Sequence, residues 1–386
     1  MKIVLVNIFF HPDSFGGATT VVEENAKLLS KAGNEVIVIS LTSRPEYVQN
    51  QIIKSSSNGV ISLQINAGPV SEEEKYLGNL DRSLLIAELI EDISPDILHV
   101  HCIQEIGINF LENIVANGNL YKTKKILSIH DYWWLYKNQF LLSDDGQFTK
   151  SKIISESENL VFNKKAKKRL KSLTKALNLF DLITTPSEYS SELYKMNYLN
   201  LDFVTLSNGI NLSSDDCAKK STSKITYGFL GGPGQVKGFE NILQAVNEIS
   251  LERTEIRLVR AHETWYKNMD LPDEFKIVER FDQEEIDKFY KKIDILLFPS
   301  QWGETFGLAI REALNRNKWV ITTREGAQME PIVDNKNGNL IGLGDNSTED
   351  LKNLFLKYDN EIPLPKGNYN YSYQDQVNEL IKIYEN

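Results

Sequence analysis

Residues 294–315 combine a buried strand, a turn and two carboxylates in a pattern that could bind a phosphorylated ligand. The apolar run at 295–298 has the length and composition of a buried parallel strand, which Pro299 and Gly303 end. Helical periodicity begins at about Phe306. A helix that begins directly after a strand offers an anion site, because its first backbone N–H groups have no partners within the helix.

Glu304 precedes this expected helix, and Glu312 lies about two turns into it. On a plain structural interpretation, Glu304 favours the positive end of the helix and Glu312 is a solvated surface charge. On a functional interpretation, both carboxylates face a ligand, and Gly307 lets the backbone approach that ligand because it has no Cβ. The residues alone leave both interpretations open.

A second glycine-rich loop, residues 231–238, follows a strand-like run at 225–230 and contains Lys237. Such a loop is a plausible phosphate cradle. It is not a P-loop, because Phe239 follows Gly238 where a serine or threonine would hold the metal ion.

The string at 303–308, followed by Glu312, resembles the Glu-x7-Glu signature of retaining GT-B glycosyltransferases of family 4. The resemblance implies that Glu304 contacts donor-sugar hydroxyls and that Glu312 accepts hydrogen bonds from the nucleotide ribose. It also implies that the backbone between these carboxylates approaches the diphosphate and sugar. The donor-binding residues expected in this stretch are Glu304, Thr305, Phe306, Gly307, Leu308 and Glu312.

Within this resemblance, Lys237 matches the family's diphosphate-binding lysine, whereas Gly232 stands where the family has an arginine. We expect Gly232 to line the donor site. We hypothesise that Arg260 or Arg324 supplies the missing guanidinium; the alternative is that both are surface arginines. Phe281, at the end of a strand-like run, is the expected contact to the nucleobase.

The first half of the chain alternates strand-like runs with helical patterns, which is typical of a parallel sheet covered on both faces. The runs are 3–8, 36–41, 97–100 and 125–129. Gly16 and Gly17 follow the first run. They form a flexible turn or, as the resemblance implies, they let a bound group approach a helix N-terminus. Gly17 is our candidate donor contact.

His99 and His101 share one face of their strand, which by itself could suggest a metal site. No third ligand stands at a suitable spacing, so we expect structural or cleft-lining histidines. His130 follows the next strand and matches the family's cleft histidine, which approaches the transferred sugar. We therefore predict His130, Glu304 and Lys237 as catalytic residues, and no metal or other cofactor.

The resemblance covers nearly the whole chain and predicts an α/β protein with the GT-B fold, in which two Rossmann-like domains with parallel sheets face each other across a cleft. Residues 1–212 would form the acceptor-binding domain together with a C-terminal helix at 371–386, which crosses back to it. Residues 224–370 would bind the nucleotide-sugar. A polar linker is expected at 213–223, and a polar insertion at 137–160.

Composition bears on the partners and the cellular compartment of the protein. The formal net charge of −10 argues against binding to nucleic acid. Two distant cysteines favour a reduced cytoplasmic compartment. The apolar N-terminus indicates a first buried strand rather than a signal peptide.

The basic stretch 164–175 carries an apolar stripe at helical spacing, which predicts either peripheral contact with the inner face of the cytoplasmic membrane or a helix packed on the sheet.

The implied reaction transfers a sugar, of the hexosyl type, from a nucleotide-sugar to a saccharide or lipid-linked hydroxyl acceptor, with retention of configuration and without a metal. Synthesis of a cell-envelope polysaccharide or glycolipid is the expected setting. A GT-B epimerase or phosphorylase is one alternative. A non-catalytic GT-B subunit that binds a catalytic partner is another, supported only by the missing arginine at Gly232.

Overall fold

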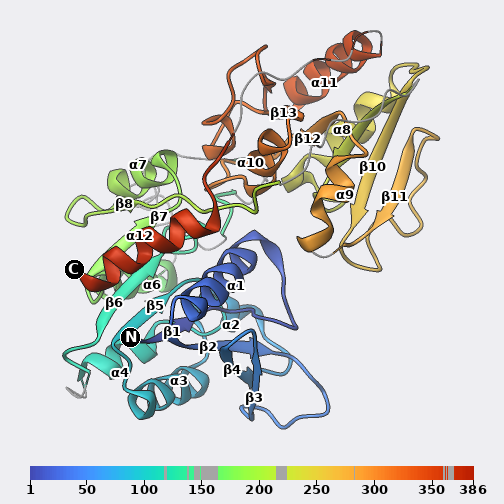
Figure 1. Ribbon diagram of the computed structural model, residues 1–386. Helices are drawn as coiled ribbons and strands as arrows, with labels where there is room; N and C mark the ends of the chain where they lie inside the picture. Colours follow the sequence, from blue (N-terminus) through green and yellow to red (C-terminus); the bar gives the residue numbers. More distant parts are fainter. Residues whose placement is uncertain are drawn as a thin grey trace. The chain divides into compact units, whose positions relative to one another are not determined.

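The computed structural model divides into two compact units, each built on its own sheet (Figure 1). Unit 1 comprises residues 1–209 and 372–386, and unit 2 comprises residues 210–371. The expected insertion and linker lie largely outside the described residues, as does Cys217. The structure describes residues 1–116, 120–136, 139–142, 148, 164–213, 224–281, 283–359, 361, 363 and 369–386.

Unit 1 contains an eight-stranded sheet in the order β3-β4-β2-β1-β5-β6-β7-β8. Every neighbouring pair is parallel except β3 and β4, which form an antiparallel hairpin at the edge. The expected runs of the first half are confirmed as strands, whereas this hairpin was not predicted. The strands are β1 (Lys2–Val6), β2 (Glu35–Thr42), β3 (Ile52–Ser57), β4 (Val60–Asn66), β5 (Ile97–Val100), β6 (Lys124–Ser128), β7 (Leu182–Thr185) and β8 (Val204–Thr205).

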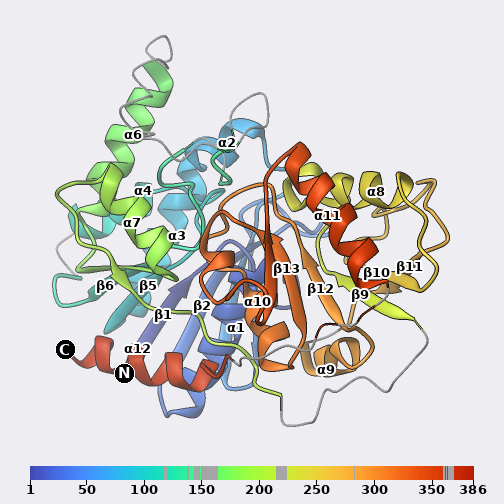
Figure 2. The same cartoon turned by 90° about the horizontal axis from the view of Figure 1, so that it is seen from above.

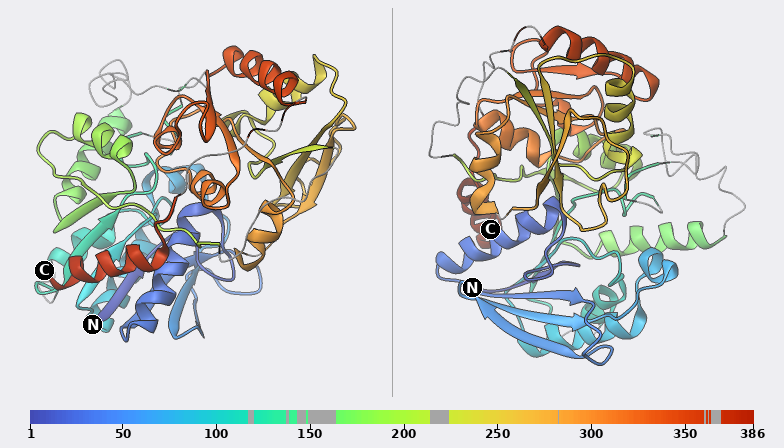
Figure 3. Two further views of the ribbon diagram at one scale, coloured as in Figure 1. Left: turned by 45° about the horizontal axis from the view of Figure 1, so that its top comes forward. Right: turned by 90° about the vertical axis from the view of Figure 1, so that its right-hand side faces the viewer.

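Helices cover both faces of this sheet, as expected for parallel strands with apolar side chains on both sides. Helices α1 and α12 pack on one face around a core that includes Val22 and Leu380. Figure 3 shows the blue helix α1 on one side of the sheet and the cyan helices on the other. The helices are α1 (Gly16–Lys31), α2 (Glu72–Leu77), α3 (Leu80–Ile93), α4 (Asn109–Ala116), α6 (Lys164–Leu177), α7 (Glu188–Asn197) and α12 (Tyr373–Glu385).

Helix α12 belongs to unit 1, which confirms that the end of the chain returns to the first domain. Ser372 caps its N-terminus with a capping box. Gly209, the last residue before unit 2, donates its N–H to Gln376 Oε1 at 2.9 Å. A Cβ at Gly209 would lie 2.3 Å from the nitrogen of Tyr373, so the two crossings between the units pass in direct contact. Tyr371 lies in unit 2 rather than with the C-terminal helix.

Unit 2 contains a six-stranded, wholly parallel sheet in the order β11-β10-β9-β12-β13-β14. The strands are β9 (Ile225–Phe229), β10 (Thr254–Arg260), β11 (Phe275–Glu279), β12 (Ile295–Phe298), β13 (Trp319–Thr323) and β14 (Gly338–Ile341). Because β9 and β12 are parallel neighbours, the loops that follow them leave the sheet at the same edge.

The helices of unit 2 enclose two apolar layers, one on each face of the sheet. Helices α8 (Phe239–Asn247) and α11 (Asp345–Tyr358) pack on one face, and α9 (Ile286–Tyr290) and α10 (Leu308–Asn315) on the other (Figure 2). Helix α10 begins at Leu308, later than the expected Phe306, because Gly307 has a left-handed φ of +79° and serves as the N-cap.

In the described part of the chain, no helix is long and apolar enough to cross a membrane.

Candidate functional site

The loops that follow β9 and β12 bring Lys237 and Glu304 into direct contact. Lys237 Nζ donates a hydrogen bond to Glu304 Oε1 at 2.7 Å, and Ser300 Oγ donates to the same oxygen at 2.6 Å. The Glu304 side chain is only 10% exposed, whereas that of Lys237 is 36% exposed. The ammonium is therefore the accessible member of the pair, and an anionic ligand can approach it.

Aromatic side chains hold the Lys237 ammonium from another side. Its nitrogen lies 5.4 Å from the ring centroid of Trp302 and 5.9 Å from that of Phe298. Both distances fall within the range of a cation–π contact. These rings restrict where the ammonium can move, so the charge is positioned before a ligand arrives.

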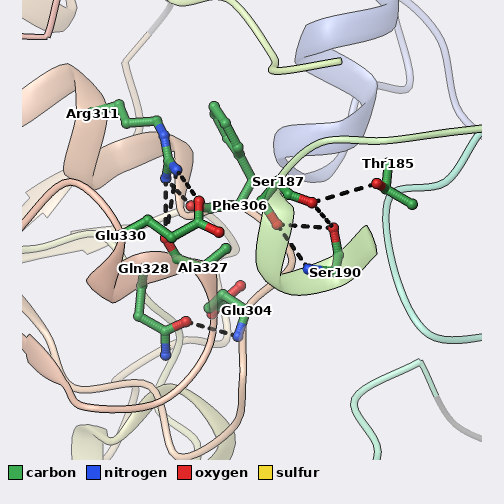
Figure 4. A network of polar contacts seen from close by, with 9 residues as sticks. All are labelled: Thr185, Ser187, Ser190, Glu304, Phe306, Arg311, Ala327, Gln328 and Glu330. Carbon is green, nitrogen blue, oxygen red and sulfur yellow. Dashed lines mark hydrogen bonds and ion pairs between the residues drawn. The ribbon is translucent and has the colours of Figure 1, made fainter. Parts of the chain in front are cut away.

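The backbone around Glu304 is fixed by Gln328, which sequence reasoning did not single out. The Gln328 amide accepts the Glu304 N–H at 2.9 Å (Figure 4). It also donates to the carbonyl of Trp302 at 2.9 Å. Gly326 makes room for this arrangement: a Cβ there would lie 2.5 Å from the nitrogen of Glu304. Gln328 is completely buried, so the turn that carries Glu304 is tied to the interior of unit 2.

Arg311 is the second residue that the sequence analysis missed. Its guanidinium is buried, and it lies 3.7 Å from the ring centroid of Phe306. It donates to the carbonyl oxygen of Phe306 and pairs with Glu330 at 3.2 Å (Figure 4). Burial lowers the pKa of this guanidinium. Arg311 thereby joins the turn before α10 to the segment that follows β13.

The remaining predicted residues of this turn lie where α10 begins. Thr305 and Phe306 are buried, and Leu308 is half-buried. At Gly307, whose φ is positive, an added Cβ would lie 3.3 Å from the Cα of Gln328. The first N–H groups of α10 therefore follow directly on a turn in which backbone packs closely against backbone.

Glu312 lies within α10 and is buried, so it is not the solvated surface charge of the plain interpretation. Gln283 Nε2 donates to Glu312 Oε1 at 2.7 Å. Burial is the main cause that raises the pKa of Glu312 to about 7, and the charge of Arg316 opposes this shift. The structure thus brings Lys237 and Glu304 together, whereas Glu312 lies on the following helix and accepts its hydrogen bond from Gln283.

The two arginines proposed to replace the family's arginine have other partners in this structure. Arg260, at the end of β10, pairs with Glu279 on the edge strand β11. Arg324, after β13, pairs with Asp334 at 3.6 Å and donates to the carbonyl of Leu340 on β14. In the sheet order, both sets of partners lie on the sides away from β9 and β12.

The other predicted donor contacts of unit 2, Phe281 and Gly232, each lie against an aromatic ring. Phe281 is half-buried and stacks on Phe289, with ring centroids 5.3 Å apart. Gly232 lies against the indole of Trp265. The role of Phe281 as a nucleobase contact stays a prediction.

In unit 1, His130 stacks on His101 instead of standing alone. The ring centroids are 5.2 Å apart, and His101 Nδ1 lies 3.0 Å from His130 Nε2, so one nitrogen donates a hydrogen bond to the other. Burial lowers the pKa of His130 to about 4, which favours the neutral imidazole at neutral pH. His130 can then donate or accept a hydrogen bond but carries little charge.

His99 and His101 are buried, in keeping with the structural role expected for them. His99 Nδ1 lies 2.7 Å from the Tyr384 hydroxyl of α12, and His99 Nε2 lies 2.7 Å from Ser128 Oγ. Burial lowers the pKa of His99 to about 3. Within the ranges that the structure describes, no group of three or more histidine, cysteine, aspartate or glutamate side chains could hold a metal ion.

Asp131, next to His130, was not singled out from the sequence. Trp133 donates its N–H to Asp131 Oδ1 at 2.8 Å, and Gln104 donates to the other oxygen. Burial raises the pKa of Asp131 to about 6 in spite of these hydrogen bonds. Gly17, in contrast, is exposed in the first turn of α1, and Gly16 has a φ of +82°.

The basic stretch forms helix α6, and its apolar stripe packs into unit 1. Leu173 and Leu177 are buried, and Arg169 donates to the carbonyl of Trp133 at 2.7 Å. Lys171 and Lys175 stay exposed. Leu173 and Leu177 are therefore part of the core, whereas the exposed Lys171 and Lys175 can make other contacts.

Comparison with solved structures identifies the fold of this chain. The chain superposes on sucrose-phosphate synthase from Thermosynechococcus elongatus with a TM-score of 0.70 and 14% identity, covering 100% of this chain and 98% of that one. It superposes on Anabaena HepE, solved with UDP and glucose, with a TM-score of 0.67 and 13% identity, covering 100% and 99%. The two α/β units with parallel sheets are those of the GT-B fold.

Family comparison then gives the membership. The family described as Glycosyltransferase Family 4 matches residues 15–214, more than half of the chain, and the family described as Glycosyl transferases group 1 matches residues 216–361. The chain belongs to Glycosyltransferase Family 4. Among curated proteins, it is 24% identical over 347 residues to an uncharacterized 42.6 kDa protein in the cps region of Klebsiella pneumoniae. The alignment covers 86% of this chain and 87% of the relative.

Proposed function

We propose that this glycosyltransferase moves a sugar, of the hexosyl type, from a nucleotide-sugar donor to a hydroxyl group of a saccharide or lipid-linked acceptor, with retention of anomeric configuration. The contact between Lys237 and Glu304 at the carboxyl ends of β9 and β12 carries this proposal. It places a cation for a diphosphate beside a carboxylate that can accept hydrogen bonds from sugar hydroxyls. The UDP and glucose bound to Anabaena HepE also favour a nucleotide-sugar donor.

The reaction breaks the bond between the anomeric carbon and the diphosphate and forms one to the acceptor oxygen. The acceptor proton passes to the departing phosphate, whose negative charge increases as the bond breaks. Lys237 and the N-terminus of α10 would stabilise that charge. Glu304 would orient the sugar through its hydroxyls, and we assign it no covalent step.

Glu312 would accept hydrogen bonds from the ribose, and Phe281 would border the nucleobase. His130 would offer the transferred sugar a neutral imidazole, which fits its lowered pKa. No metal enters this scheme, because Lys237 and the backbone amides supply the positive potential. The Klebsiella relative encoded in a cps region favours polysaccharide synthesis as the setting.

Nucleotide binding and donor turnover test the proposal. Thermal unfolding with UDP, GDP, ADP and dTDP should show stabilisation by at least one, and the matching nucleotide-sugar should be consumed with or without EDTA. Lys237→Met should reduce turnover by about a hundredfold or more, since a charge-stabilising group is lost. Lys336→Met removes an exposed lysine of the same unit and should leave turnover unchanged. No response to any nucleotide would instead favour a non-catalytic subunit.

We also propose that α6 contacts the inner face of the cytoplasmic membrane through its lysines alone. Leu173 and Leu177 are buried in unit 1, so the contact would be electrostatic, at ~1 kcal/mol for each lysine near the surface. Vesicles that contain phosphatidylserine should bind the protein, and vesicles of phosphatidylcholine should not. Replacing Lys168, Lys171 and Lys175 with glutamine should abolish the binding; retained binding would place the contact elsewhere.

A further inference from the structure

The segment 261–269, in the connection between β10 and β11, places two aromatic side chains against the glycine-rich loop that contains Lys237. The Tyr266 hydroxyl donates to the carbonyl of Gly231 at 2.6 Å. The indole of Trp265 lies against Gly232: a Cβ at that position would be 2.9 Å from Cζ2 and 3.2 Å from Cε2 of the ring. A side chain at position 232 would therefore have to displace the indole.

This placement of Trp265 is fixed by its neighbour. Tyr266 has a φ of +62°, a left-handed conformation that is uncommon for a bulky residue. Its ring is buried against Phe239, with centroids 5.1 Å apart. The buried ring and the hydrogen bond to Gly231 hold this conformation, and they set the orientation of Trp265, which packs edge-on to Tyr266 at 78°. Unusual backbone conformations that persist in this way are frequent at ligand sites.

The six-membered ring of the indole lies against the loop, with Cζ2, Cη2 and Cε2 nearest to a Cβ placed at Gly232. Cε2, one of the three ring atoms nearest to Gly232, is the atom that bears the indole nitrogen. Trp265 is only half-buried, so part of its side chain is open to a ligand. In the part of the chain that the structure describes, no side chain or carbonyl accepts a hydrogen bond from this N–H.

Lys237 belongs to the same cradle. A Cβ at Gly231 would lie 3.0 Å from the Cβ of Lys237, so the lysine stem and the glycines covered by Trp265 and Tyr266 are in contact. Arg260, at the end of the neighbouring strand β10, is paired with Glu279. The cradle thus offers one accessible ammonium and, beside it, a neutral donor on a fixed aromatic ring.

We propose that Trp265 binds the donor diphosphate: its indole closes the cradle over Gly232, and its N–H donates a hydrogen bond to a phosphate oxygen next to Lys237. The inference rests on the proposed nucleotide-sugar donor and extends it. Trp265 then takes the place that we first assigned to Arg260 or Arg324. The site binds a doubly charged group with a single cation and a directional neutral donor, instead of two cations.

Calorimetric titration separates the phosphate contact from a contact to the base. UDP, GDP, ADP, dTDP and the corresponding nucleosides are titrated into the wild type, Trp265→Phe and Met269→Ala. Trp265→Phe keeps a ring and removes the N–H, so it should weaken the diphosphate that binds by about tenfold, as expected for a hydrogen bond to a charged acceptor. The nucleoside should bind Trp265→Phe and wild type equally. Met269→Ala, an exposed change in the same segment, should have no effect.

A second pair of variants tests the space over Gly232. Gly232→Arg should lose diphosphate binding, because the new side chain meets the indole. The double variant Gly232→Arg with Trp265→Ala should bind again, because the guanidinium then has room and replaces the N–H.

Three results would decide against the assignment. Unchanged diphosphate affinity in both Trp265→Phe and Trp265→Ala would overturn it, with thermal unfolding showing that both variants are folded. Equal losses for diphosphate and nucleoside would show that the ring contacts the base instead. A wild type that binds none of the four diphosphates would overturn the proposed function together with this inference, so the two failures are distinguishable.

Discussion

Glu312 offers the sharpest test of the site, because its buried carboxyl should make the protein less stable as the pH rises. Its pKa is raised from 4.5 to about 7. Below about pH 4.5 the carboxyl is protonated in both the folded and the unfolded chain, so its ionisation does not lower the free energy of unfolding. Between pH 4.5 and 7 the unfolded chain loses its proton while the folded chain retains it, so stability falls across this window.

The size of the effect follows from the same values. A difference of one in pKa corresponds to ~1.4 kcal/mol, so ionisation of Glu312 should cost unit 2 about 3 kcal/mol by pH 8. Glu312→Gln keeps the shape of the side chain and never ionises. This variant should match the wild type near pH 4.5 and exceed it in free energy of unfolding by a few kcal/mol at pH 8.

The assay is urea unfolding at pH 4.5, 6 and 8, with Glu252→Gln as the control because Glu252 is exposed in the same unit. The control should show the same difference from wild type at every pH. Nucleotide affinity should fall in Glu312→Gln even where stability rises, because an amide oxygen accepts more weakly from ribose hydroxyls than a carboxylate does. A difference in stability between Glu312→Gln and wild type that is independent of pH would refute the reasoning.

Three further changes test the scaffold. Gly326→Ala places a Cβ 2.5 Å from the nitrogen of Glu304 at a φ of +84°, so it should lower the free energy of unfolding by more than about 2 kcal/mol and abolish donor binding. The control Gly344→Ala, at positive φ in open space, should cost about 1 kcal/mol and leave binding intact. Equal effects of the two changes in urea unfolding and titration would contradict this. Arg311→Leu should cost about 3 kcal/mol in urea unfolding, because buried carbonyls lose their donor; a cost below 1 kcal/mol would show that the guanidinium is dispensable. Tyr384→Phe should destabilise unit 1 by about 1–2 kcal/mol, because His99 Nδ1 loses its hydroxyl partner. Hydrogen exchange should show that α12 opens more readily, and unchanged exchange would show that this bond does not stabilise the helix.

The parts of the fold and site that the sequence predicts are those with local signals. Apolar runs identify the inner strands, because both faces of a parallel sheet are buried. Lys237 and Glu304 were predicted from loop motifs, and the structure brings them together. Their contact depends on β9 and β12 being neighbours, although β10 and β11 lie between them in the sequence.

The missed residues act through contacts that no local pattern contains. Arg311 appears in the sequence as an ordinary charge on a helix, and only the packing of the segment after β13 gives it Glu330 as a partner. Gln328 is similarly uninformative until Gly326 brings it against Glu304. The strand β3 was missed because its second half is a run of serines, which resembles a loop, and the edge of a sheet needs little apolar burial.

The return of the chain at residues 209 and 372 has a practical consequence for engineering. Unit 2 is an insertion in unit 1, and its two ends are adjacent, since Ile210 donates its N–H to the carbonyl of Tyr371 at 3.1 Å. A module whose ends meet can be exchanged for that of a relative with a short graft at one place, leaving helix α12 and the core beneath it uncut. Chimeras joined at these two residues would test the proposal that residues 1–212 bind the acceptor and residues 224–370 the nucleotide-sugar, since they should then keep their acceptor preference while adopting a new donor.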